Sequence, residues 1–527
     1  MVSIGTLCCI LLLLTPSVQS SQRHLSLASA LGSNMVLQRR VPARLWGWSE
    51  PGDTITITVG SHEVHTAVAD SVSGAWEVNL PAREANSSGT TVGIQSSDQN
   101  THILLTDILF GDVLLCSGQS NMELPTIFVD RGEVDELLSR LEDFTLIRLL
   151  VVERNPFNHG PDIGVLVPWS LPSPSSLVGS QTVPFGNWFS ALCWATGRAR
   201  HESNNLPLGL IQADAGSTPI QAWLPPDAAV ACRRPAPWTD DFDYWGTRLP
   251  PSSFFDSIIK PLAPMRLAAV VWYHGESNLP LPGAEEEEAA YYRCALATMV
   301  SAWRLLWAQE WGLVTIQLHA MRRRHYSPTG FALLRQAQHD SSAALSNTHM
   351  VTAIDLGDPG DDLHPKYKLQ LAQRITWSLE GLLSSTLLAH ETSGPVAVGA
   401  QFRSGRIIIH FAPATVGSDG IVLSPAPACP VEASDCVGLQ LVALEGGVVQ
   451  VHPVRTQHVS TVGATLVMAQ EAATERMQES EGGDRLFVQY CWGPWPLATI
   501  FNEAGLPAPP FRFPVAASRS AALHTDL

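Results

Sequence analysis

A serine at the end of an apolar segment is the first candidate for catalysis in this chain. Residues 108–115 are rich in β-forming side chains and lead into residues 116–122, Cys-Ser-Gly-Gln-Ser-Asn-Met, which present Ser120. A buried strand that ends in a tight turn is a common way to hold a serine hydroxyl rigid, exposed and beside backbone N–H donors. Far downstream, residues 361–365 (Asp-Asp-Leu-His-Pro) can supply a general base and a carboxylate that orients it. Together the two segments predict a serine esterase.

The pattern along the chain predicts three folded parts that would position these residues. Residues 21–109 contain short alternating segments, such as 54–60 and 75–80, and predict a small antiparallel β domain. From 110 to 388 apolar strands alternate with longer helical stretches, which predicts an α/β domain with a mainly parallel sheet. Residues 389–515 predict a C-terminal β domain, and a flexible tail is expected over 516–527. In the α/β domain we expect strands at 147–152, 208–213, 268–273, 313–318 and 350–355, and helices at 188–202, 284–307 and 367–382.

The candidate residues follow the ends of these strands. Ser120, Gly216, Gly275 and the segment 361–365 each come directly after an expected strand. Because the carboxyl ends of parallel strands meet at one edge of a sheet, we expect these residues to form a single site there.

Composition and charge restrict the class of protein. The 527 residues exceed what one hydrophobic core usually holds, so two to four domains are expected. Hydrophobic residues make up 45% and charged residues 15%, the balance of a globular protein with large buried sheets. The net charge of −17 argues against nucleic acid or an anionic membrane as a partner.

The N-terminus is typical of a secretory signal. Residues 4–15 form a continuous apolar run that is followed by small residues and is too short to span a membrane. We therefore expect a signal peptide over 1–20, no transmembrane anchor and a protein of the secretory pathway; a buried N-terminal helix is the alternative. The sequon Asn-Ser-Ser makes Asn86 the expected glycosylation site.

Seven cysteines remain beyond the first twenty residues. They show no C-x-x-C spacing, which argues against a thiolate metal site. Cys429 and Cys436 would close a short loop and are the disulfide that we expect. The odd number leaves a free thiol, for which Cys116, in apolar surroundings, is the candidate.

The ordered motifs of the chain resemble those of the sialate O-acetylesterase family, within the wider SGNH hydrolases. The resemblance rests on residues 111–122, 207–211, 216–223, 271–278, 303–304, 355–359, 363–365 and 506–511. It implies a three-layer α/β core flanked by β domains, in secreted or lysosomal enzymes that remove acetyl groups from sialic acids, at the 9-hydroxyl and other positions. It also implies that no cofactor or metal is required, and that the partner is an acetylated sialic acid or sialoglycan, with no obligate protein partner evident.

The resemblance further implies a role for each site residue. Ser120 would be the nucleophile, His364 the base, and Asp361, with Asp362 as the alternative, the carboxylate that orients the imidazole. The oxyanion hole would consist of the backbone N–H groups of Ser120 and Gly216 and the side chain at position 274. The expected substrate pocket comprises Gln119, Asn121, Glu276 and Asn278.

Three positions near this site depart from the family. Position 274 is His where the family has Gln, and Ala215-Gly216-Ser217-Thr218 replaces Trp-Gly-Gly-Thr. Asp256 stands where relatives carry Asn. The departures indicate an altered substrate or weak activity, whereas the intact triad residue types favour an enzyme.

Three other functions compete with this interpretation. A relative could bind the acetylated glycan without hydrolysing it, or hydrolyse other acetylated carbohydrates. A metal-dependent deacetylase is disfavoured, because H-E-x-x-H is absent from the sequence. The acidic run 285–288 begins an expected helix, where carboxylates favour the positive end of the dipole, and is interpreted as a solvated face.

Overall fold

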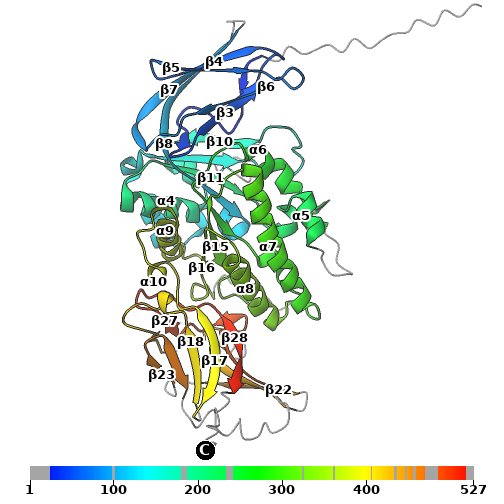
Figure 1. The fold of residues 1–527 in the computed structure, drawn as a ribbon, viewed down its shortest axis with the longest axis vertical. Helices are drawn as coiled ribbons and strands as arrows, with labels where there is room; N and C mark the ends of the chain where they lie inside the picture. Colours follow the sequence, from blue (N-terminus) through cyan, green and yellow to red (C-terminus); the bar gives the residue numbers. More distant parts are fainter. Residues whose placement is uncertain are drawn as a thin grey trace, which may run out of the picture.

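The computed structural model has three regions of elements along its long axis (Figure 1). It describes residues 24–97, 101–179, 187–232, 241–322, 326–359, 363–404, 406–425, 427–431, 436–445, 448–454, 459–468 and 485–517. The expected signal peptide lies outside the described residues. Of the tail expected over 516–527, residues 516 and 517 belong to a strand that ends at Ala517, and the rest lies outside the described residues. Within the part of the chain that the structure describes, no helix is both long enough and apolar enough to cross a membrane.

The N-terminal region consists of strands. They are β1 (Ser26–Leu27), β2 (Val36–Gln38), β3 (Ala43–Trp48), β4 (Thr54–Val59), β5 (Glu63–Val68), β6 (Ala75–Leu80), β7 (Asn86–Ser96) and β8 (His102–Gly118). Strands β1, β3 and β6 form one sheet, while β4 pairs antiparallel with β5 and β7, and β7 pairs antiparallel with β8. Buried and exposed residues alternate along β4 and β6, as the period-two pattern predicts for a sheet with one solvated face.

Strand β8 belongs to two parts of one sheet. Residues 102–110 pair antiparallel with β7, whereas residues 112–118 pair parallel with β11 (Leu208–Asp214). Because β8 carries both pairings, the eleven-stranded sheet is mixed, and the mainly parallel sheet expected from the sequence is found only in its central part.

The central part has the strand order β10-β9-β11-β8-β14-β15-β16. Its further strands are β9 (Ile147–Val152), β10 (Val165–Ser170), β14 (Ala269–Tyr273), β15 (Gly312–Gln317) and β16 (Thr348–Thr352). The neighbours are parallel except β10, which runs antiparallel to β9. Every residue of β9, β11, β14 and β15 is buried, as expected for strands covered on both faces.

Helices cover this part of the sheet. The long ones are α4 (Ala191–Asn204), α7 (Glu285–Trp307), α8 (Pro328–Ala343) and α9 (Leu369–Ser384). Helix α4 packs with α9 and α7 with α8, and Figure 1 draws the two pairs on opposite sides of the strands. The acidic run 285–288 lies in the first turn of α7. The shorter helices are α1 (Ser120–Glu123), α2 (Arg131–Leu137), α3 (Pro174–Val178), α5 (Pro226–Ala231), α6 (Lys260–Leu262) and α10 (Ala389–Thr392), and the hairpin β12 (Phe242–Tyr244)–β13 (Thr247–Leu249) follows α5.

The expected C-terminal β region is present. Its main sheet has the order β22-β21-β25-β28-β17-β18-β24-β23. These strands are β17 (Ala397–Arg403), β18 (Arg406–Phe411), β21 (Leu439–Glu445), β22 (Val448–Pro453), β23 (Val459–Val462), β24 (Thr465–Met468), β25 (Arg485–Tyr490) and β28 (Phe511–Ala517). Two small sheets pair β19 (Val422–Leu423) with β27 (Ile500–Phe501) and β20 (Cys436–Val437) with β26 (Trp495–Pro496).

The disulfides correct one expectation and confirm another. Cys429 is bonded to Cys436, as predicted. Cys116, expected to be the free thiol, is bonded to Cys193 and joins β8 to α4. The free cysteine among the described residues is the buried Cys491, and the third disulfide joins Cys232 to Cys294. Apolar surroundings suit a buried disulfide as well as a buried thiol, so the composition around Cys116 could not separate them.

Candidate active site

A glycine turn at the end of β8 presents Ser120. Gly118 has φ +133°, and a Cβ there would collide with the backbone carbonyl of Tyr273 on the neighbouring β14, so the position requires glycine. The Gln119 N–H donates to the Tyr273 carbonyl oxygen at 3.1 Å. Ser120 then begins α1, half-exposed at the carboxyl end of the strand.

The structure brings His364 to Ser120 across 244 positions of sequence. The distance between His364 Nε2 and Ser120 Oγ is 3.0 Å. At this distance Nε2 can accept the serine proton when the ring proton is on Nδ1, which is the tautomer that a general base requires. Asp361 and Asp362, the two candidates for the orienting carboxylate, lie outside the described residues, so their role stays a prediction.

Asn121 links the serine turn to the segment that carries His364. Its Nδ2 donates to the Leu363 carbonyl oxygen at 2.9 Å and to Glu276 Oε1 at 2.5 Å. The buried Lys368 donates from Nζ to Asn121 Oδ1 at 3.0 Å. The Asn121 side chain thus ties the serine turn to the segment of His364. Its oxygen accepts from Lys368, and its nitrogen donates to the Glu276 carboxylate as well as to Leu363.

The other expected pocket residues also bond to the loops around the site. Gln119 Oε1 accepts from the backbone N–H groups of Gly275 (3.3 Å) and Ser277 (3.4 Å). Asn278 Oδ1 accepts from the Ile220 N–H at 2.8 Å. Gln119, Asn121, Glu276 and Asn278 are all buried, so in this structure they join the loops that surround Ser120.

The amide of Gly216, expected in the oxyanion hole, is engaged by a carboxylate that the sequence analysis missed. Its N–H donates to Glu123 Oε2 at 2.6 Å. A Cβ on Gly216 would lie 3.4 Å from the Ser120 Cβ, which places this glycine directly against the serine. Glu123 follows Ser120 by three residues, and that proximity was the available signal for it.

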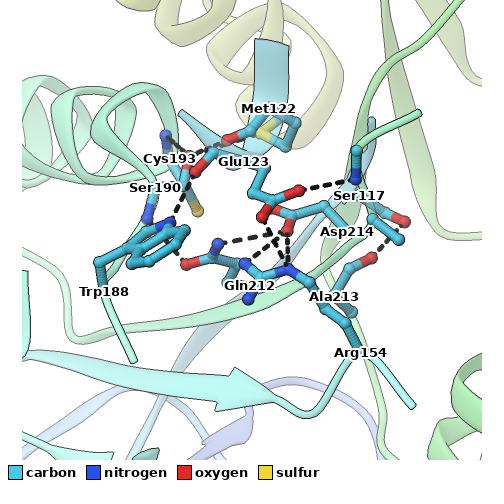
Figure 2. Close-up of polar contacts among 12 residues, drawn as sticks. Ser117, Met122, Glu123, Arg154, Trp188, Ser190, Cys193, Gln212, Ala213 and Asp214 are labelled. Carbon is cyan, nitrogen blue, oxygen red and sulfur yellow. Dashed lines mark hydrogen bonds and ion pairs between the residues drawn. The ribbon is translucent and has the colours of Figure 1, made fainter. Parts of the chain in front are cut away.

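Glu123 belongs to a cluster of three charges with Arg154 and the fully buried Asp214 (Figure 2). The Arg154 guanidinium lies 3.4 Å from Glu123 Oε1 and 2.9 Å from Asp214 Oδ1. Burial raises the pKa of Asp214 to about 7, although Arg154 opposes this shift. Asp214 ends β11 directly before Ala215 and Gly216, so the cluster holds the loop that lies against Ser120.

His274 makes contacts other than those expected of it. Its buried Nε2–H donates to the Thr218 carbonyl oxygen at 2.9 Å, and Nδ1 lies 3.2 Å from the Tyr292 hydroxyl. The ring stacks on Trp272 and Tyr292, with centroids 5.1 and 5.9 Å apart. Both nitrogens therefore have protein partners, and donation to an oxyanion would require the bond to Thr218 to be exchanged. The sequence shows that position 274 is a histidine, but it could not predict the orientation of the imidazole ring.

The burial of His274 predicts how stability changes with pH. Desolvation lowers its pKa from 6.5 to about 3, so between these values the unfolded chain binds a proton that the folded chain does not. Stability should therefore rise with pH across this window, by up to about 1.4 kcal/mol per pH unit. We expect the free energy of unfolding of the wild type, measured by urea denaturation, to fall more steeply from pH 6.5 to pH 4.5 than that of His274→Gln. Equal slopes would contradict this explanation.

The other two departures, at Ala215 and Asp256, both precede His274 in the sequence. Ala215 is buried, and its N–H donates to the Gly118 carbonyl oxygen at 3.1 Å. Asp256 lies in a short π-helical segment, Phe255–Ile259, and its N–H donates to the Ser252 carbonyl oxygen at 2.9 Å.

Ser217, which replaces a glycine of the family motif, has φ +63° and is exposed. A left-handed conformation costs a non-glycine residue about 1–2 kcal/mol, and glycine would remove this strain. Part of the gain would be offset because glycine also makes the unfolded chain more flexible. We expect Ser217→Gly to raise the free energy of unfolding by about 0.5–1 kcal/mol, measured by urea denaturation. A fall in stability would mean that the serine side chain makes a compensating contact.

Comparisons with known proteins agree with the motifs. Residues 173–376 match the family model described as a carbohydrate esterase, sialic acid-specific acetylesterase. The sialate O-acetylesterase of Homo sapiens is 29% identical over 376 residues, covering 66% of this chain and 69% of that protein. The enzyme of Mus musculus is 26% identical over 426 residues, covering 71% and 76%.

The resemblance to the sialate O-acetylesterase family is confirmed. A solved structure, that of a carbohydrate acetylesterase from Xanthomonas citri, is similar with a TM-score of 0.74 and 23% identity, over 92% of this chain and 99% of that chain. This likeness shows that the mixed α/β fold with its added β region occurs in a carbohydrate esterase. The sequence analysis did not single out four charged residues around the site, namely Glu123, Arg154, Asp214 and Lys368.

Proposed function

We propose that this chain is a serine esterase that hydrolyses O-acetyl esters of sialic acids, at the 9-hydroxyl and at other positions. The contact of 3.0 Å between His364 Nε2 and Ser120 Oγ is the observation that carries the proposal. The similarity to sialate O-acetylesterases indicates the substrate class.

In the proposed reaction, Ser120 Oγ attacks the acetyl carbonyl carbon while its proton passes to His364 Nε2. The tetrahedral intermediate then expels the sugar hydroxyl, which receives that proton, and leaves an acetyl-enzyme. Water, deprotonated by His364, then attacks the carbonyl carbon of this ester. The bond to Ser120 Oγ breaks, that oxygen takes the proton from His364, and acetate is released. Asp361, or Asp362, would hold the imidazole in the tautomer that accepts from Ser120.

The oxyanion is assigned to the N–H groups of Ser120 and Gly216. Because Glu123 Oε2 lies on the Gly216 N–H, the substrate carbonyl oxygen has to replace a carboxylate oxygen at that donor. Each such donor contributes about 3 kcal/mol to stabilising the transition state. We assign His274 to the support of the same loop through Thr218, and Gln119, Asn121, Glu276 and Asn278 to the walls of the substrate pocket.

The finer assignments follow the same proposal. The SGNH-type three-layer core would extend over 110–388, between β domains at 21–109 and 389–515. Residence in the secretory pathway, in lysosomes or outside the cell, is supported by the three disulfides, which persist in oxidising compartments. Asn86, half-buried at the start of β7, is the proposed glycosylation site.

A second function is favoured by one observation. The Glu123 carboxylate on the Gly216 amide would hinder an oxyanion there, as in a relative that binds acetylated glycan without turning it over. An esterase for other acetylated carbohydrates is the remaining alternative.

The deciding experiment measures acetate release from 9-O-acetyl-N-acetylneuraminic acid, acetylated xylan and 4-nitrophenyl acetate by the purified protein. Preferential release from the sialic acid supports the proposal, and preference for xylan would transfer the activity to other carbohydrates. No release from any substrate, with the sialic acid still bound in calorimetry, would establish the binding function instead.

A further inference from the structure

One tryptophan differs from the others in its surroundings. The chain has sixteen tryptophans, of which Trp238 lies outside the described residues. Among those that the structure describes, only Trp245 is exposed, with 75% of its surface accessible. Single exposed apolar side chains are common, so the exposure of this indole gains meaning only from its backbone and its neighbours.

The backbone makes the choice of tryptophan more unusual. Trp245 and Gly246 form the two-residue turn between β12 and β13, where Tyr244 pairs with Thr247. Their φ values are +51° and +83°. Two positive values are typical of a type I′ turn, in which Asn-Gly and Gly-Gly are preferred and a bulky side chain is strained by about 1–3 kcal/mol. Folding alone would thus favour asparagine over tryptophan at this position.

Aromatic contacts connect this hairpin to the loop beside Ser120. Trp245 meets Tyr244 edge-on with centroids 6.5 Å apart, and Tyr244 meets Phe254 at 5.1 Å. Phe254 stacks on Trp223 at 5.3 Å, and the Trp223 Nε1–H donates to Thr218 Oγ1 at 3.0 Å. Thr218 follows Gly216 by two residues, so the hairpin is anchored to the loop that lies against Ser120.

The electrostatics of Tyr244 agree with this placement. Burial, together with the negative charge of Glu123, raises the pKa of Tyr244 to about 12. Glu123 is the residue that accepts from the Gly216 amide. The hairpin therefore lies close enough to Glu123, Arg154 and Asp214 for their charges to act on Tyr244.

The surroundings of the indole select the kind of ligand. Its neighbours Asp243, Thr247 and Arg248 are exposed and polar. A lipid surface or a protein partner would need a contiguous apolar patch of several hundred Å², which one indole among polar side chains does not provide. A pyranose ring combines an apolar C–H face, which stacks on an aromatic ring, with a rim of hydroxyls that hydrogen-bond to polar neighbours.

We propose that Trp245 is a stacking platform for a pyranose ring of the glycan whose acetyl group is presented to Ser120. The inference rests on the proposed function and deepens it, because it assigns recognition of the sugar to a residue outside the reacting centre. The strained turn then serves to present the indole on its rigid hairpin.

The test compares Trp245→Ala and Trp245→Phe with the wild type on a 9-O-acetylated sialyl trisaccharide and on 4-nitrophenyl acetate. We expect Trp245→Ala to raise KM for the trisaccharide about tenfold, with kcat little changed, and Trp245→Phe to retain most of the affinity. The effect of Trp245→Ala on the hydrolysis of 4-nitrophenyl acetate, which has no sugar ring, should be much smaller. Leu305→Ala is the matched control, since Leu305 is 82% exposed on α7.

Two results would overturn the platform. One is an unchanged KM for the trisaccharide in Trp245→Ala; the other is an equal loss on both substrates, which would indicate a general disturbance of the fold. If the wild type releases no acetate, the proposed function fails by itself. The platform is then decided by calorimetric binding of the trisaccharide to Ser120→Ala against the Ser120→Ala, Trp245→Ala double variant, where equal dissociation constants would reject it.

Discussion

Alanine in place of Ser120 is expected to lower the rate of acetate release from 9-O-acetyl-N-acetylneuraminic acid by at least about 10⁴-fold. The variant keeps the pocket and the oxyanion donors but has no atom to form the acetyl-enzyme, and His364 Nε2 loses the hydroxyl that lies 3.0 Å away. Because the residues of a triad act as a unit, His364→Ala should cost about as much as Ser120→Ala, and the double variant little more. The measurement is the initial rate of acetate formation, with folding of each variant checked by circular dichroism.

Ser117→Ala is the matched control for this loss. Ser117 lies three residues earlier in β8, is buried, and donates from Oγ to the Ala213 carbonyl oxygen at 2.6 Å. Its removal should lower stability by about 1 kcal/mol while activity stays within a few-fold of the wild type. Substantial activity in Ser120→Ala would instead point to a nucleophile elsewhere and would reject the assignment of Ser120.

Methionine in place of Arg154 is expected to lower the free energy of unfolding by about 3–5 kcal/mol. The guanidinium lies between the carboxylates of Glu123 and Asp214, and the side chains of Arg154 and Asp214 are 10% and 0% exposed. Without it, Asp214 either takes up a proton or stays ionised beside Glu123 with no cation to compensate. Urea denaturation at pH 7.5 measures the loss. Near pH 5 the loss should be smaller, since the pKa of Asp214, raised by burial to about 7, then leaves that group protonated.

The exposed pair of Arg40 and Glu84 provides the comparison. Its N–O distance of 2.9 Å is as short as that between Arg154 and Asp214, but the side chains are 61% and 74% exposed. Arg40→Met should therefore change stability by less than about 1 kcal/mol. Adding Asp214→Asn to Arg154→Met should restore part of the loss. A small effect of Arg154→Met alone would show that water reaches the cluster.

Much of the α/β core could be predicted because its signal is local. An unbroken apolar run bounded by turn residues predicted the strand at 147–152, which the structure has with the same bounds. The approach of Ser120 and His364 could also be predicted, because both follow strands whose carboxyl ends meet at one edge. The mixed character of the sheet was missed because β8 runs on without a break from one set of partners to the next.

The charged cluster could not be predicted, because its members come from three separate segments. Glu123 lies in α1, Arg154 follows β9 and Asp214 ends β11, and single charges in a sequence do not reveal whether they will be buried together. The contact of His274 with Thr218 depends on the rotamer of the histidine side chain. The disulfide between Cys116 and Cys193 depends on how α4 packs against the sheet. Such features arise from tertiary contacts between segments distant in the sequence.

The continuity of β8 also bears on how the protein can be divided. The seventeen residues of this strand pair with β7 at one end and with β11 and β14 at the other, immediately before the nucleophile. A truncated protein that begins near His102 would lose the partners of half the strand and expose an unpaired β edge, which favours aggregation. Strands β4, β5 and β7 and the strand that ends two residues before Ser120 should therefore unfold cooperatively, so that hydrogen exchange in β7 reports on the integrity of the catalytic turn.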